Sequence, residues 1–209
     1  METKENLSDT ELLQLMTTGD PEALTALYRR RQRSVYRFAL QMCGSAAIAE
    51  DITQEVFLVL IHDAGAFDAS RGSLSNFLLG LARNHVLRRL QRERFYVPMI
   101  DSNEDGAKEV IPPPSLISTG GPFDDLARTE TIESVRRAVL ALPERYREVV
   151  VLCDLQELSY AETAEVLGCA VGTVRSRLHR ARALLISKLR PTVKEETAAA
   201  ELNSTRCFA

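Results

Sequence analysis

The sequence lacks the residue patterns on which most enzymes and metalloproteins depend. No glycine-rich phosphate-binding loop is present, and no nucleophile stands at a recognisable spacing from a base. The histidines and cysteines are scattered and include no CxxC pair: His62, His85, His179, Cys43, Cys153, Cys169 and Cys207. This scatter gives no metal-ligand spacing and favours reduced thiols. The sequence therefore predicts no catalytic site, no metal and no cofactor.

Long apolar runs and a net positive charge are absent too. No segment approaches the ~18 apolar residues that a membrane span requires, and the N-terminus METKENLSDT does not resemble a signal peptide. We therefore expect a cytoplasmic protein that does not insert into a membrane. The formal charge of the 209 residues is -3, so any nucleic-acid-binding surface must be local and offset by acidic segments elsewhere. An apolar fraction of 45% is typical of a globular protein with one or two domains.

The most informative segment runs from Ser159 to Arg190. Ser159 and Glu162 have the spacing of a capping box, and Gly168 follows the apolar residues of a short helix. A second helix from about Gly172 has an apolar inner face. Its other positions hold six cations and no acid: Arg175, Arg177, Arg180, Arg182, Lys188 and Arg190. This pattern predicts a helix-turn-helix whose second helix enters the DNA major groove.

A basic helix face is often merely solvated, so the count of cations alone leaves DNA contact open. A solvated helix, however, tends to pair its cations with acids at helical spacing. The second helix has no such acids, which favours phosphate as the partner of its cations.

The N-terminal half is predicted to be helical, with start signals at Ser8, Asp20-Pro21, Ser45 and Ser73. The helix after Ser45 has an apolar stripe from Ile48 to Ile61 and a polar face of acids and glutamine. Considered on this helix alone, that face is better explained by simple solvation. Residues 64–72 interrupt the helical pattern and contain Phe67, and the helix after Ser73 is rich in arginine.

Between about residues 96 and 123 the sequence collects prolines, glycines and acids, as in VIPPPSLISTGGPFDD. Such a segment is long for a connection inside one compact domain and predicts a flexible acidic linker. The prediction is an all-α protein with two small helical domains, at residues 8–95 and 124–190. The second contains the helix-turn-helix, and residues 191–209 are expected to form a disordered tail.

Two stretches of the sequence resemble a known family, the extracytoplasmic-function (ECF) group of bacterial RNA polymerase sigma factors. The resemblance to sigma region 2 runs through IAEDITQEVFLVL and FDASRGSLSNFLLGLARNHVLRRLQR. The resemblance to region 4 runs through LPERYREVVVLCDLQELSYAETAEVLGCAVGTVRSRLHRARALL. It implies a protein that binds core RNA polymerase and promoter DNA, performs no chemistry of its own and is held inactive by an anti-sigma factor.

The resemblance also assigns residues to three surfaces. A docking face would bind the polymerase and consists of Asp51, Gln54 and Glu55. A strand-capture surface would hold the melted minus-10 element and consists of Phe67, Asp68, Arg71, Ser73, Asn76, Arg83, Asn84, Arg88, Arg89 and Arg92. A recognition face would read the minus-35 element and consists of Thr173, Arg175, Ser176, Arg177, His179, Arg180 and Arg182. A flipped base needs an aromatic or polar pocket beside cations, and arginine can fork onto guanine.

Three positions depart from the family pattern. Phe77 stands where tryptophan is common, Arg88 where aspartate is frequent, and Ala170 where serine or proline usually precedes Val-Gly-Thr. The promoter sequence is therefore left open. The alternative from another class is a helix-turn-helix repressor or activator, which would bind a palindromic site as a dimer. That alternative does not explain the arginine-rich helix and aromatic loop of the first domain.

Overall fold

The computed structural model describes residues 4–96 and 122–205, and within those ranges it contains helices and no strand. The α-helices are α1 (Asp9–Thr17), α2 (Pro21–Cys43), α3 (Ala46–His62), α4 (Leu74–Tyr96), α5 (Pro122–Leu140), α6 (Glu144–Val150), α7 (Tyr160–Leu167) and α8 (Val171–Thr205). Shorter turns are η1 (Lys4–Asn6), η2 (Ala64–Ala66), η3 (Ala69–Arg71) and η4 (Val151–Leu155). The all-α prediction is confirmed, whereas nearly all of the predicted linker lies outside the described residues.

Local capping signals determine where several helices begin. Ser8 and Ser159 each form a full capping box with a glutamate three residues later. Asp20 accepts hydrogen bonds from two backbone amides of α2, and Ser45 accepts one from α3. Because these bonds satisfy amides that the first helical turn leaves unpaired, each start is encoded within a few residues.

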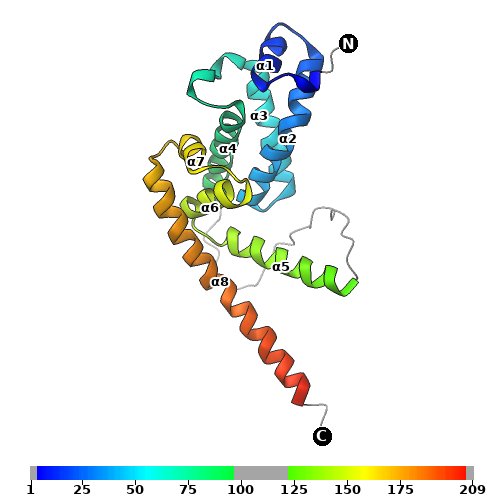
Figure 1. The fold of residues 1–209 in the computed structure, drawn as a ribbon, viewed down its shortest axis with the longest axis vertical. Coiled ribbons are helices and arrows are strands. Elements are labelled where there is room, and N and C mark those ends of the chain that lie inside the picture. The colour runs from blue at the N-terminus through cyan, green and yellow to red at the C-terminus, as the bar shows by residue number, and fades with distance from the viewer. Residues whose placement is uncertain (1–3, 97–121, 206–209) are drawn as a thin grey trace.

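The N-terminal half is built around α2, which contacts α1, α3 and α4 (Figure 1). Phe38, Leu27 and Met42 of α2 are fully buried, and Leu60 of α3 and Leu78 of α4 pack in the same core. The apolar stripe predicted for α3 included Ile61 among the inward-facing residues. In the structure the Ile61 side chain is 45% exposed. It lies one residue beyond Leu60, so the helical rotation carries it away from the core.

The C-terminal half packs α5, α6 and α7 against the first part of α8. Between α6 and α7 the chain forms the π-helical turn η4, which the sequence pattern did not predict. Helix α8 continues beyond the predicted end near Arg190, so residues 191–205 are helical (Figure 1). Ala198–Ala200 favour this continuation, whereas Pro191, which has no backbone N–H to donate, opposes it.

The two halves are in contact along α2 and α4. Arg147 of α6 donates to the backbone oxygen of Met42 at the end of α2 at 2.5 Å. Gln156 donates to Gln41 at 2.9 Å. Apolar packing accompanies these hydrogen bonds, because the buried hydrophobic residues of the two halves form one cluster.

Candidate nucleic-acid interface

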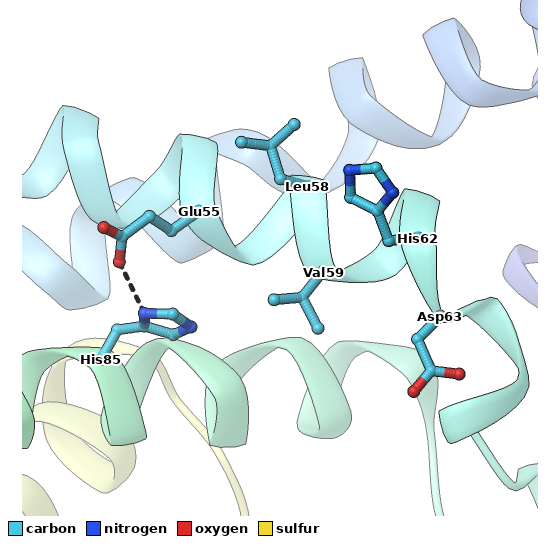
Figure 2. Close-up of a pocket in the computed structure, with 6 residues that line it drawn as sticks. All are labelled: Glu55, Leu58, Val59, His62, Asp63 and His85. Carbon is cyan, nitrogen blue, oxygen red and sulfur yellow. Dashed lines mark ion pairs between the residues drawn. The ribbon is translucent and has the colours of Figure 1, made fainter.

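The three residues of the docking face are exposed on α3. Glu55 is paired with His85 of α4, with 2.6 Å between Oε2 and Nδ1 (Figure 2). Further along α3, Leu58 is 52% exposed, and both it and Glu55 line a pocket between α3 and α4. The acidic docking face is therefore bordered by an exposed apolar side chain, Leu58. The exposed leucine is a feature that helical periodicity alone did not single out.

The residues before α4 form an ordered turn rather than an open loop. Asp68 accepts hydrogen bonds from the backbone amide and the hydroxyl of Ser70, at 2.9 and 2.7 Å. Both bonds lower the pKa of Asp68 below its usual value, and the bond from the Ser70 hydroxyl has the larger effect. Phe67 packs on Phe77 with ring centroids 5.6 Å apart, so the predicted base-capturing aromatic is half-buried. Arg71 and Ser73 are exposed beside it.

The arginine-rich face of α4 divides into two parts. Asn84, Arg88, Arg89 and Arg92 are exposed, as the sequence predicts. Arg83 instead points to the C-terminal half, where its Nε lies 2.7 Å from Oε1 of Glu148. The remaining predicted residue, Asn76, is 6% exposed. The strand-capture surface is thus only partly open in this structure.

The exposed part of α4 lies next to the docking face. A second pocket between α3 and α4 is lined by Asp51 and Glu55 from one side and by Arg88, Arg89 and Arg92 from the other. Sequence reasoning treated the two sets as separate surfaces. The structure brings them into one groove because α3 and α4 pack side by side.

The helix-turn-helix consists of α7 and α8. The left-handed conformation of Gly168, with φ 62°, ends α7 and turns the chain towards α8. Val174, Leu178 and Ala181 are buried, so α8 turns its other face outwards. The recognition face is accordingly accessible: Arg175, Ser176, His179, Arg180 and Arg182 are exposed, and Thr173 and Arg177 are partly exposed.

Two arginines of the recognition face already have partners within the protein. The Arg175 guanidinium lies 5.9 Å from the ring centroid of Tyr160. Arg182 forms a two-pronged pair with Asp154 of η4, at 3.1 and 2.6 Å, which raises the pKa of Arg182. The pair ties α8 to the preceding turn. The sequence analysis placed Arg182 on the recognition face and did not predict this partner.

Two residues absent from the predicted sites contact them in the structure. Glu148 pairs with Arg83, and Glu165 accepts a hydrogen bond from Asn76 at 2.8 Å. Their partners lie 65 and 89 positions away, so no local signal in the sequence could have found these contacts.

Within residues 4–96 and 122–205, no cluster of histidine, cysteine and acidic side chains is arranged to hold a metal ion. The helices searched over the same part of the chain include none with the length and apolar character of a membrane span.

The fold and these surfaces define an all-helical DNA-binding protein with a helix-turn-helix in its C-terminal half and a second basic surface, on α4, in its N-terminal half. Family models agree with both parts: sigma-70 region 2 matches residues 27–96, and sigma-70 region 4 matches residues 132–185. The chain belongs to the ECF RNA polymerase sigma factors.

Individual relatives support this membership. The ECF RNA polymerase sigma factor SigW of Bacillus subtilis is 30% identical over 175 residues, which cover 82% of this chain and 91% of SigW. SigM of Mycobacterium tuberculosis, also an ECF sigma factor, is 34% identical over 178 residues, which cover 85% of this chain and 83% of SigM.

Two solved structures have a similar fold. CnrH, solved with the cytosolic domain of CnrY, aligns with a TM-score of 0.63 and 24% identity over 88% of this chain and 97% of CnrH. The sigma factor RpoE of Bartonella quintana, solved with the anti-sigma factor NepR, aligns with a TM-score of 0.59 and 23% identity over 78% of this chain and 94% of RpoE.

Proposed function

We propose that this sigma factor joins core RNA polymerase through the docking face and positions it on a promoter with two elements. The recognition face reads the upstream element as a duplex, and the strand-capture surface holds the melted downstream strand. The observation that carries this division is the placement of two basic surfaces on different halves of the molecule, one on α4 and one on α8.

The chemistry of each surface suits its proposed substrate. The exposed arginines of α8 lie on one face of a helix, where they can reach base edges and phosphates in the major groove. The aromatic turn at Phe67 and the exposed arginines of α4 suit an unstacked strand, whose bases stack and whose phosphates need cations. The acidic docking face, with Leu58 exposed beside it, suits a protein partner rather than DNA.

We further propose that the protein performs no chemistry of its own, acts in the cytoplasm and serves a regulon that responds to stress or another signal. Control by an anti-sigma factor is part of this proposal. It is supported by family membership and by the solved complex of RpoE, in which the partner of that protein is the anti-sigma factor NepR.

The test is transcription with purified core polymerase and this protein on fragments of genomic DNA, followed by mapping of the transcript starts. We expect starts that share two sequence elements upstream and that disappear when the protein is omitted. A protein that instead bound a palindromic site as a dimer, and yielded no such starts, would refute the proposal.

A further inference from the structure

Three exposed arginines of the recognition face differ in what holds their guanidinium groups. Arg175 lies over the ring of Tyr160, and Arg182 is paired with Asp154. Arg180 has no hydrogen bond or ion pair within the part of the chain that the structure describes. The difference matters because an arginine reads a base through N–H donors that must be both well directed and unoccupied.

The position of Tyr160 is fixed by the start of α7. Tyr160 is the first residue of this helix and follows its N-cap, Ser159. The backbone amide of Ser159 donates to Glu162 at 2.9 Å, and the amide of Glu162 donates to the Ser159 hydroxyl at 3.2 Å. These reciprocal bonds hold the first turn in place. Tyr160 itself is 38% exposed, so its ring lies at the surface on an anchored backbone.

The ring holds Arg175 in a different way from that in which a carboxylate holds an arginine. The guanidinium carbon lies 5.9 Å from the ring centroid, and the face of an aromatic ring attracts a cation without accepting hydrogen bonds along the guanidinium edge. Asp154 instead accepts bonds from two nitrogens of Arg182. Arg175 is therefore restrained with its donors still available, whereas Arg182 is restrained and occupied.

We propose that Tyr160 is a positioning residue for promoter recognition, and that its ring orients the Arg175 guanidinium towards a guanine of the upstream element. This inference rests on the proposed function, since it adds a residue of α7 to the reading of that element by α8. An arginine that is held before binding loses less side-chain freedom when it meets the base. Arg180, which has no such support, is ordered only by the DNA.

The size of the effect follows from the strength of an exposed cation–π contact, which corresponds to about 2- to 5-fold in a binding constant. A direct contact between arginine and guanine corresponds to about 5- to 150-fold. Loss of the Tyr160 ring should therefore weaken discrimination less than loss of Arg175 itself.

The experiment uses core polymerase with the full chain on a mapped promoter and on versions that carry each single change in the upstream element. Tyr160→Leu removes the ring and keeps an apolar side chain, whereas Tyr160→Phe keeps the ring and removes the hydroxyl. Arg175→Ala identifies the base pair that this arginine reads, and Tyr160→Leu/Arg175→Ala closes a double-mutant cycle. The matched control is Tyr28→Leu, which removes a tyrosine of nearly equal exposure, 37%, from α2.

We expect Arg175→Ala to lose its preference at one base pair and Tyr160→Leu to lose about 2- to 5-fold of the preference at the same base pair. The base pair that depends on Arg180 should be read as in the wild type. In the Arg175→Ala background Tyr160→Leu should have no further effect, because the ring acts only through that arginine. Tyr160→Phe and Tyr28→Leu should keep the wild-type preference, and thermal midpoints show that each variant is folded.

Undiminished preference in a folded Tyr160→Leu variant would overturn the positioning role, and so would a loss spread evenly over all base pairs or a further loss in the double variant. Equal weakening by Tyr160→Phe on every sequence would also overturn it, because the hydroxyl would then act on a phosphate. The proposed function fails separately, if the wild-type protein with core polymerase shows no preference among upstream sequences at all.

Discussion

Replacement of Arg180 by alanine should relax recognition of the upstream promoter element without unfolding the protein. Arg180 is exposed on the recognition face, and the described part of the chain gives it no hydrogen bond or ion pair. Its guanidinium is therefore available to fork onto a guanine. One such contact contributes about 1–3 kcal/mol of discrimination, which corresponds to about 5- to 150-fold.

Arg182 supplies a matched comparison on the same helix. Its guanidinium is occupied by Asp154, and the two side chains are 54% and 28% exposed. A pair so open to solvent contributes at most about 1 kcal/mol to stability. Arg182→Ala should therefore lower the thermal midpoint slightly and leave the preference among upstream sequences unchanged.

The assay is transcription with core polymerase on a mapped promoter and on versions with single changes in the upstream element. Arg180→Ala should lose its preference at one base pair, while core binding by gel filtration stays at the wild-type level. Equal discrimination by Arg180→Ala and wild type would refute the reasoning. So would a greater loss of discrimination in Arg182→Ala.

Three further predictions test other parts of the molecule. Asp51→Ala/Glu55→Ala should lower the affinity for core polymerase, measured by co-elution, and unchanged co-elution would contradict the docking face. Ser159→Ala should reduce the free energy of unfolding by about 0.5–2 kcal/mol in a urea titration, because α7 loses its N-cap. The hydrogen bonds from Ser159 lower the pKa of Glu162, so their contribution is present above the pKa of the unfolded chain and is lost as the pH falls through the lowered folded value. The stability difference between wild type and Ser159→Ala should therefore shrink in acid; a constant difference would count against this linkage. Phe38→Ala should cost about 3–5 kcal/mol, since the side chain is fully buried in α2, and a loss below about 1 kcal/mol by the same titration would be inconsistent with that core.

The positions of most helices could be predicted from the sequence because their signals are local. Ser8, Asp20, Ser45 and Ser159 each bond to amides no more than three residues away. Apolar periodicity likewise identified the inner faces of most helices, since the side chain follows the helical rotation. The prediction was wrong for Ile61, which lies at the edge of the stripe on α3 and is exposed.

Contacts between distant segments could not be predicted in this way. The pairing of Arg83 with Glu148 depends on how the halves meet, and nothing near either residue encodes it. The π-helical turn at Val151–Leu155 was missed for a related reason, because its residues are as apolar as those of an ordinary helix. Asp154 in that turn determines what Arg182 does.

The groove shared by α3 and α4 affects how genetic data on this protein should be interpreted. Asp51 and Glu55 line it together with Arg88, Arg89 and Arg92. Salt at physiological concentration screens exposed charges over a Debye length of about 8 Å, so charges that line one groove still influence one another. A charge reversal at Asp51 would therefore alter the potential felt by a DNA strand at the arginines as well as the contact with polymerase. Defects in promoter opening and in polymerase binding would then appear in the same mutant although each arises from a different partner.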